Sequence, residues 1–341
     1  MITYSTNKEW LDLTVEPPLE PELKICDPHH HLWEFRDVCV AHKYLFEEFM
    51  ADVTCGHNVV STVYVEGGAM YRETGPDEMK PVGETEFANG VAAMSASGLY
   101  GDARIAAGIV GCADLRLGDA VKPVLEAHMQ VAGDRFRGIR HQLNWDASEL
   151  LPNGRFCSGE FLSQDTKFRE GFACLAPLGL TFDAWCYHTQ IPQITELARA
   201  FPETTIILNH FGGPLGHGPY AGRQEEIFQN WKQSISDLAT CPNVVAKLGG
   251  LNLELNGFGW HLNERPPTSE ELMEKTRRYY EHTIEEFGVD RCMFESDFPP
   301  DMITCSYNVL WNSYKRLTAT YSHSEKADLY HDTASRIYKL D

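Results

Sequence analysis

Short apolar runs rich in β-branched residues alternate with longer amphipathic stretches along nearly the whole chain. The short runs predict β-strands, because each is too short for a typical helix and is bounded by polar loop residues. They cover residues 23–27, 59–65, 104–110, 136–141, 180–185, 204–209, 243–248 and 291–295. Stretches with helical spacing lie between them at 84–97, 119–131, 190–200, 224–238 and 269–287. Continuously apolar strands alternating with helices indicate a parallel sheet that is buried on both faces.

Eight such strands in one chain predict a (β/α)8 TIM barrel. A doubly wound sheet is the alternative, but no Gly-x-Gly-x-x-Gly follows the first strand and polar residues end most strands. Long connections at 67–87, 144–168 and 249–268 are expected to cover the active-site face of the barrel. We expect one domain over 23–341, preceded by a polar, proline-bearing surface arm at 1–22.

Polar residues stand at or just beyond the C-terminal ends of the predicted strands, which is the edge where barrel enzymes carry their active sites. The set comprises His29, His31, Glu66, Asp114, Arg140, His141, His188, His210, Lys247 and Asp297. His29 and His31 can face one centre, because alternate residues of an extended segment point the same way. Taken singly, most of these residues have an ordinary structural explanation. A common site requires the barrel to bring them together.

Net charge, apolar runs and cysteine spacing indicate which kinds of binding partner and cellular compartment suit the protein. The 341 residues carry a formal net charge of −20, which argues against binding to nucleic acid or to an anionic membrane, since both need a basic surface. No apolar run is long enough to span a bilayer, and the first residues do not resemble a secretion signal. None of the ten cysteines forms a Cys-x-x-Cys pair. We therefore expect reduced cysteines and a cytoplasmic protein.

Six motifs in order along the chain resemble the amidohydrolase superfamily, and within it the amidohydrolase 2 group. They are Asp-Pro-His-His-His-Leu-Trp (27–33), Phe-Arg-Gly-Ile-Arg-His (136–141), Tyr-His-Thr-Gln-Ile-Pro (187–192), Leu-Asn-His-Phe-Gly-Gly-Pro (208–214), Val-Ala-Lys-Leu-Gly-Gly-Leu (245–251) and Met-Phe-Glu-Ser-Asp-Phe-Pro (293–299). The resemblance covers residues 23–340. It is greatest to the branch that holds sugar-lactone and 2-pyrone-4,6-dicarboxylate lactonases.

This resemblance implies one divalent metal ion, Zn2+ by preference, bound by His29, His31 and Asp297 with His188 as a further ligand. It also implies catalytic roles for Asp297, His188 and His210. The fourth strand ends in Arg140 and His141, so no lysine stands there to bridge two metals. Some lactonases of this branch work without metal, and a metal-free site is therefore the alternative.

Ester hydrolysis needs an activated water, a polarised carbonyl group and a proton for the leaving oxygen. Asp297 is the expected general base, and either Zn2+ or fixed cationic groups would polarise the carbonyl. Arg140 suits a substrate carboxylate, because its guanidinium offers a planar, bidentate fork. Further expected substrate contacts are Glu66, Tyr71, Arg72, His141, Trp145 and Lys247.

The sequence thus predicts a hydrolase of a lactone, derived from a sugar acid or from an intermediate of aromatic degradation. The substrate would be a small molecule that is anionic or polyhydroxylated, and a homo-oligomer is left open. A Zn-dependent, non-oxidative decarboxylase of an aromatic or unsaturated acid is the alternative. A third hypothesis is a barrel that binds a ligand without catalysis. The Gly-Ile-Arg-His and Tyr-His-Thr-Gln motifs favour the lactonase.

Overall fold

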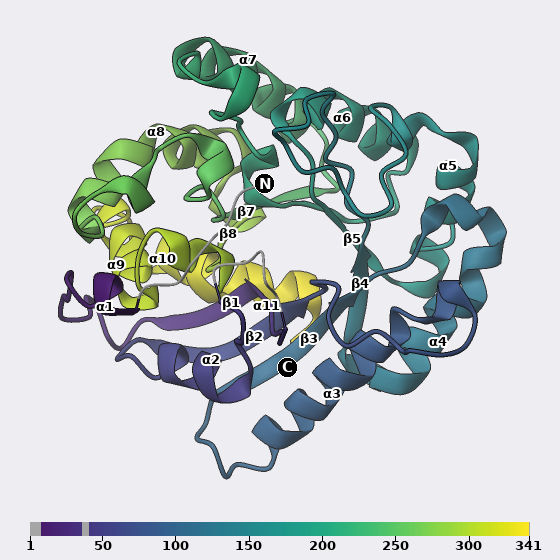
Figure 1. The fold of residues 1–341 in the computed structure, drawn as a ribbon, viewed down its shortest axis with the longest axis horizontal. Coiled ribbons are helices and arrows are strands. Elements are labelled where there is room, and N and C mark those ends of the chain that lie inside the picture. The colour runs from purple at the N-terminus through teal and green to yellow at the C-terminus, as the bar shows by residue number, and fades with distance from the viewer. Residues whose placement is uncertain (1–7, 36–40, 341) are drawn as a thin grey trace.

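Eight parallel strands form a ring in the computed structural model, which describes residues 8–35 and 41–340 (Figure 1). Each strand pairs with the next along the chain. The strands are β1 (Lys24–His30), β2 (Asn58–Val65), β3 (Arg104–Gly111), β4 (Phe136–Arg140), β5 (Thr181–Ala184), β6 (Ile206–Leu208), β7 (Val244–Leu248) and β8 (Cys292–Phe294). The segment after β8 closes the ring on β1, because the Asp297 N–H donates to the His29 carbonyl over 3.0 Å. The predicted TIM barrel is confirmed.

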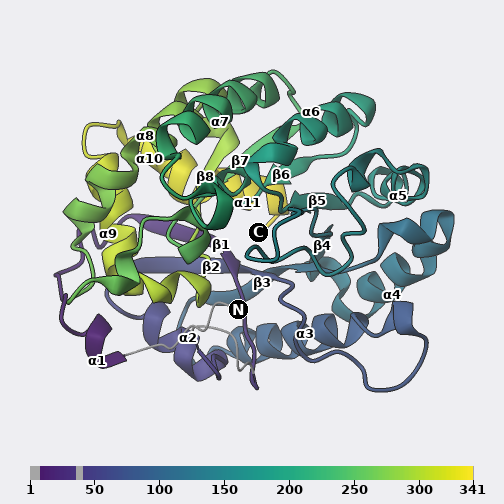
Figure 2. The same ribbon diagram turned by 45° about the horizontal axis from the view of Figure 1, so that its top comes forward.

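Helices surround the ring of strands (Figure 2). They are α1 (Lys8–Leu11), α2 (Phe46–Val53), α3 (Val82–Ala96), α4 (Lys122–Ala132), α5 (Thr166–Phe172), α6 (Ile191–Ala200), α7 (Gln224–Ala239), α8 (Ser269–Phe287), α9 (Tyr307–Leu317), α10 (His323–Ala327) and α11 (Thr333–Tyr338). Local sequence sets their ends: α8 starts at a capping box of Thr268 and Glu271 and stops before Gly288, whose φ is 81°. Its bounds are those that the apolar spacing predicts.

The core has two parts. The larger part lies between strands and helices, and includes the face of α6 formed by Ile191, Ile194 and Leu197. A smaller cluster fills the barrel interior with one or two side chains from most strands. Its members are Cys26, Val63, Val65, Val110, Ile207, Val245, Met293, Ala334 and Tyr338. The last two belong to α11, which lies across the ring of strands in Figures 1 and 2.

The predicted strands agree with the observed ones except at their ends. The first strand is longer than predicted: it continues through Asp27 to His30, so that His29 is held within the sheet. The last strand is shorter than predicted: the Glu295 N–H still donates to the Leu248 carbonyl of β7 over 3.4 Å, but Ser296 and Asp297 bond to β1 instead. Both differences arise where the ring closes, and this closure is a long-range contact that local sequence does not encode.

The described part of the N-terminal arm, residues 8–22, follows the outside of the barrel. Thr14 donates to the Pro266 carbonyl and Glu16 accepts from the Ser269 N–H, over 2.9 and 2.8 Å. The nine cysteines in the described ranges are free thiols, while Cys39 lies outside these ranges. Within the same ranges, no helix has the length and apolar character needed to cross a membrane.

Candidate active site

The carboxylate of Asp297 lies close to three histidines, two from the end of β1 and one that follows β6. Its Oδ1 lies 3.7 Å from Nε2 of His29, 3.5 Å from Nε2 of His31 and 3.7 Å from Nε2 of His210. All four side chains are buried. The barrel therefore brings His29 and His31, His210 after β6 and Asp297 after β8 close together, as the barrel prediction requires. His30 points away and stacks on Phe49.

Two of these residues have unfavourable backbone conformations. Asp297 has a φ of 51° and His210 a φ of 52°, in the left-handed region that L-residues other than glycine rarely adopt. Such a conformation costs on the order of 1 kcal/mol and persists where the surrounding structure enforces it, commonly at functional sites. Both carbonyl and N–H of Asp297 are hydrogen-bonded, to Asp301 and His29. These bonds hold the strained residue in place.

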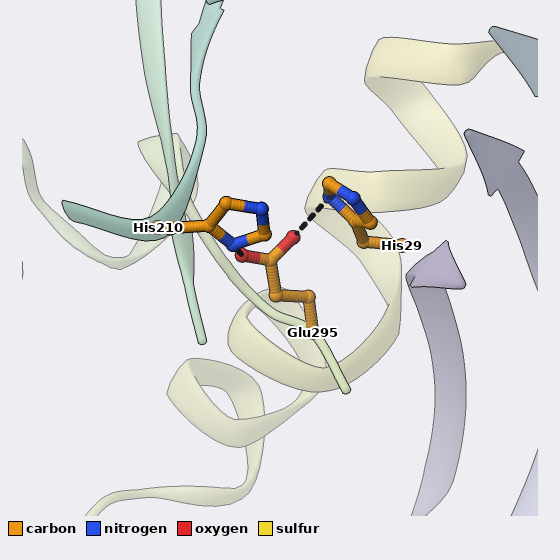
Figure 3. A group of neighbouring side chains, drawn as sticks. All are labelled: His29, His210 and Glu295. Atoms are coloured by element: carbon orange, nitrogen blue, oxygen red, sulfur yellow. Dashed lines mark ion pairs between the residues drawn. The ribbon is translucent and has the colours of Figure 1, made fainter. Parts of the chain in front are cut away.

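Glu295 holds two of the imidazoles from the side opposite Asp297. Its two carboxylate oxygens lie 2.8 Å from Nδ1 of His29 and 2.8 Å from Nδ1 of His210 (Figure 3). The Gly249-Gly250 pair after β7 makes room for this arrangement. A Cβ on Gly249 would lie 2.4 Å from Cγ of Glu295, and one on Gly250 would lie 2.1 Å from Nδ1 of His210. The two glycines are therefore required by close packing behind the site.

The spacing of His29, His31 and Asp297 fits a single metal ion. Their nearest ligand atoms are separated by 3.2, 3.5 and 3.7 Å. Tetrahedral Zn2+ with bonds of about 2.1 Å places its ligand atoms roughly 3.4 Å apart. Nδ1 of His31 lies 2.8 Å from the Val65 carbonyl, an arrangement that keeps the proton on Nδ1 and places the lone pair on Nε2, the nitrogen that faces His29 and Asp297. These three residues form one of two potential ligand groups in the described ranges, and His29, His210 and Glu295 form the other.

His188 is the one expected ligand that the structure does not bring to this centre. It belongs to neither potential ligand group. Its Nδ1 lies 3.4 Å from the Leu215 N–H, and its ring packs edge-on against Tyr220. The residue begins a short 3-10 turn after β5, and this turn directs the ring toward the loop after β6. A histidine near the end of a strand can therefore miss the centre, because the loop conformation decides where its ring points.

Burial controls the charges at the centre. It raises the pKa of Asp297 to about 6, a shift that Glu295 reinforces and that His210, Arg140 and Lys247 oppose. Burial also raises the pKa of Glu295 to about 8 and lowers that of His210 to about 4. Near neutral pH, Asp297 is thus a carboxylate next to a neutral His210. A carboxylate with this pKa is well matched to accept a proton at neutral pH.

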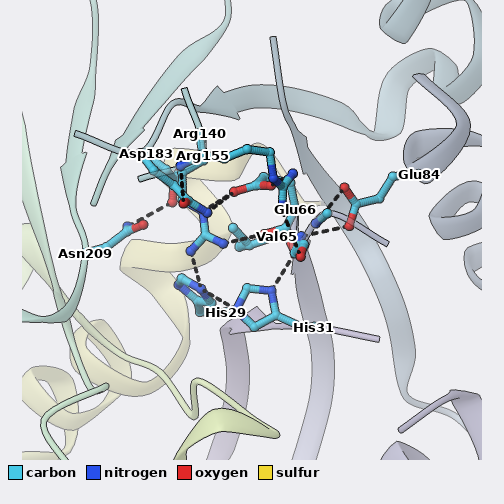
Figure 4. A network of polar contacts seen from close by, with 12 residues as sticks. His29, His31, Val65, Glu66, Glu84, Arg140, Arg155, Asp183 and Asn209 are labelled. Carbon is cyan, nitrogen blue, oxygen red and sulfur yellow. Dashed lines mark hydrogen bonds and ion pairs between the residues drawn. The ribbon is translucent and has the colours of Figure 1, made fainter. Parts of the chain in front are cut away.

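Arg140 reaches the centre from β4 and is held by Glu66. Its Nε donates to the Glu66 carboxylate over 2.9 Å, and a second guanidinium nitrogen donates to the Glu66 carbonyl (Figure 4). Its Nη1 lies 3.2 Å from Nε2 of His29. Burial opposes ionisation of Glu66, but Arg140 and Arg155 lower its pKa on balance. Glu66 was expected to contact substrate; instead it is fully buried and orients two arginines.

A cavity of about 330 Å³ opens above this centre. Its lining residues are His31, Trp33, Gly67, Arg140, Gln142, Asn144, Pro152, Asn153, Arg155, Trp185, Tyr187, Leu253, Leu255 and Pro300. Arg155 is a functional candidate that sequence reasoning missed. It lies in the long loop after β4, contacts Glu66 at 3.5 Å and donates to the Tyr71 hydroxyl and the Gly67 carbonyl. The sequence feature that could have pointed to Arg155 is its positive charge within the connection at 144–168, which was expected to cover the site.

Three residues predicted to contact substrate from the loops do not line this cavity. Tyr71 contributes through its bond to Arg155. Arg72 is paired with Glu86 at the surface, and Trp145 offers its carbonyl to the Gln190 side chain over 2.6 Å. Loop contacts that are invisible in the sequence decide these orientations.

Two residues from strand ends also lie away from the cavity. The ring of His141 packs edge-on against Phe156 and Phe168, outside the barrel interior, because it follows Arg140 and points to the opposite side of β4. Lys247 is completely buried beneath the centre, 3.3 Å from Nδ1 of His29. Lys247 therefore contacts His29 on the side away from the cavity and does not reach a substrate bound in the cavity.

A model of the amidohydrolase family matches residues 26–340. The chain belongs to the amidohydrolase family. It is 34% identical over 337 residues to the uncharacterized protein y4mH of Sinorhizobium fredii, covering 94% of this chain and 99% of that one. It is 27% identical over 240 residues to an L-fucono-1,5-lactonase of Burkholderia multivorans, covering 70% and 73%. A crystal structure of an amidohydrolase from the same species with bound zinc superposes on this amidohydrolase with a TM-score of 0.71, at 23% identity over 93% of this chain and 99% of the other.

Proposed function

We propose that this amidohydrolase hydrolyses a lactone of a sugar acid or of an aromatic-degradation intermediate. The observation that carries the proposal is the Asp297 carboxylate, buried next to three imidazoles below a cavity that reaches His31 and Arg140. A general base next to fixed cationic and imidazole donors is the arrangement that ester hydrolysis needs. Similarity to an L-fucono-1,5-lactonase over most of the chain supports the same reaction class.

The chain's own residues account for each proton in this reaction. Asp297 takes a proton from water, whose oxygen forms a bond to the lactone carbonyl carbon. Charge that develops on the carbonyl oxygen is stabilised by donors fixed before the reaction, of which Arg140 is the best placed. The ring C–O bond then breaks, and Asp297 returns its proton to the leaving oxygen. His210, neutral near pH 7, faces the same carboxylate oxygen over 3.7 Å, while backbone hydrogen bonds to His29 and Asp301 hold Asp297 in position.

We also propose that His29, His31 and Asp297 hold one divalent ion, with Zn2+ preferred. The spacing of their ligand atoms supports it, as does the zinc bound by the Burkholderia multivorans amidohydrolase. When bound, such an ion would polarise a carbonyl group and favour ionisation of a water molecule. Arg140 lies 3.2 Å from His29, so the positive charge of the guanidinium is already present at this position without an ion.

The cavity favours a small polar substrate. Its volume of about 330 Å³ suits a single substituted ring, and it is lined by the amides of Gln142 and Asn144 as well as by two arginines. The side chain of Arg155 is 33% exposed and that of Arg140 only 5%, so Arg155 is the more accessible of the two to a ligand. A carboxylate or a set of hydroxyl groups would complement these donors.

A pH-indicator assay against panels of sugar-acid lactones and aromatic acids tests the proposal. We expect acid release from at least one lactone, and its loss in Asp297→Asn. Release of CO2 from an aromatic acid without acid release from any lactone would instead establish the decarboxylase. Binding of a lactone without turnover would leave only a ligand-binding barrel.

A further inference from the structure

The C-terminal helix α11 places one tyrosine inside the barrel. Tyr338 is fully buried and belongs to the apolar cluster in the barrel interior, whose members from six strands include Cys26 and Met293. The residue after it, Lys339, accepts a hydrogen bond through its carbonyl from Arg137, at the start of β4. The helix therefore enters from the N-terminal end of the strands, opposite the cavity. Apolar packing accounts for the burial of the Tyr338 ring, but it does not account for the burial of the polar Tyr338 hydroxyl group.

That hydroxyl group contacts a buried carboxylate in the middle of the barrel. Oη of Tyr338 lies 2.9 and 3.1 Å from the two oxygens of Asp183, on β5. Asp183 also accepts from Nζ of Lys247 over 2.8 Å and from the Asn209 amide over 3.1 Å. A buried carboxylate needs such partners, and each of them fixes its orientation. The hydrogen bond from Tyr338 thus helps to orient the Asp183 carboxylate, which in turn binds the ammonium group of Lys247.

Lys247 connects this carboxylate to the candidate active site. Its ammonium group lies 3.3 Å from Nδ1 of His29 and 3.9 Å from the Glu295 carboxylate. The ring of Tyr338 lies 5.2 Å below the same ammonium group, in cation–π contact. Tyr338 therefore contacts Lys247 directly through its ring, and its hydroxyl group is linked to Lys247 through the shared partner Asp183. The position of the lysine in turn limits how the His29 imidazole can turn.

We propose that Tyr338 is a positioning residue of the active site, and that it sets the orientation of His29 through Asp183 and Lys247. The proposal rests on the proposed function for its effect on turnover, but not for its effect on His29. It assigns the C-terminal helix a part in the site although none of its residues reaches the cavity. The chain of contacts crosses the barrel from one end to the other.

The test is Tyr338→Phe, which keeps the ring and removes the hydroxyl group. We expect kcat to fall about tenfold with KM unchanged, as for the loss of one hydrogen bond to a charged group at a distance from substrate. In spectra of protein labelled with ¹⁵N-histidine, the ring nitrogens of His29, assigned with a His29→Gln variant, should shift. Asp183→Asn provides a second route to the same two effects if Tyr338→Phe does not fold.

Tyr330→Phe is the matched control, because it also removes a buried hydroxyl group, but one whose hydrogen-bond partner in the described part of the chain is Thr318, at 3.0 Å, and not Asp183. It should leave both kcat and the His29 signals unchanged. Wild-type kcat and unshifted His29 signals in a folded Tyr338→Phe would overturn the proposal, as would equal effects in the control. If no lactone is turned over, the proposed function fails, and the His29 signals still decide the role of Tyr338.

Discussion

The site has a floor and a rim, which are built in different ways. The floor comprises His29, Asp183, Lys247, Glu295 and Asp297, all within or directly beyond strands and all buried. The rim comprises Tyr71, Arg72, Trp145 and Arg155, which lie in the long loops after β2 and β4. Pairing between parallel strands fixes the floor, whereas side-chain contacts between loops fix the rim.

This difference predicts different consequences of mutation. Floor residues contact one another at 2.8 to 3.9 Å without access to solvent, so the loss of one leaves buried partners unsatisfied. We expect changes in the floor to lower kcat. Of the rim residues, Arg155 lines the cavity, and a change there should act on substrate binding and hence on KM.

The largest effect is expected from Asp297→Asn in the floor. The amide keeps the shape of the side chain but accepts no proton, and the turnover of lactone should fall by at least about 100-fold, the lower range for general catalysis. Circular dichroism should show an unchanged fold. Asp114→Asn is the control, because Asp114 also follows a strand but is paired with Arg116 at 2.7 Å, away from the cavity lining. More than about a tenth of wild-type turnover in Asp297→Asn would contradict its role as base.

The next effect concerns metal content. After incubation with Zn2+ and dialysis, wild type should retain about one equivalent of zinc, since three ligands and water complete a catalytic zinc site. His31→Ala should lose most of it, while His188→Ala should not, because His188 lies outside both ligand groups. Plasma emission spectroscopy measures this without any assay of activity. Full activity in chelator-treated protein with less than about a tenth of an equivalent would show that the site works without metal.

His29, Lys247 and Asp297 of the floor could be predicted from the sequence because the period of strands and helices is encoded locally, whereas Asp183, within a predicted strand, was missed. Given a barrel, the C-terminal ends of all strands share one face, which is why His29, His31, His210 and Asp297 were expected near one another. Glu295 stands two residues before Asp297 in the motif at 293–299, yet its role depends on the Gly249-Gly250 pair and on two histidines from other strands. Such close packing between distant segments cannot be deduced from one sequence.

The rim could not be predicted in the same way. The loop positions were recognised, but Arg72 is paired with Glu86, whereas Arg155 takes the place beside Glu66. Both are arginines in loops over the same face of the barrel. What separates them is the fold of each loop, and a loop has no periodic pattern that would indicate which side chains turn inward.

Arg155→Met tests the rim with an intermediate effect. It keeps an unbranched side chain and removes the charge that faces the cavity, so KM should rise about tenfold to a hundredfold for an anionic lactone while kcat changes little. Steady-state kinetics on the best lactone measure both parameters. Arg72→Met is the control in the same rim and should leave KM unchanged. If kcat falls and KM does not, Arg155 belongs functionally to the floor and the division between the two regions fails.

The smallest effect on activity is expected at His141, next to Arg140 but on the other side of β4. Burial lowers the pKa of His141 to about 4, whereas a histidine in the unfolded chain has a pKa of about 6.5. The unfolded chain therefore binds more protons between these values, so stability is complete above pH 6.5 and is lost as the pH falls toward 4. Between pH 7.5 and 4.5, the free energy of unfolding measured with urea should fall by about 2 to 3 kcal/mol less in His141→Gln than in wild type, and KM should be unchanged. An equal loss of stability together with a raised KM would place His141 at the substrate instead, as the sequence had led us to expect.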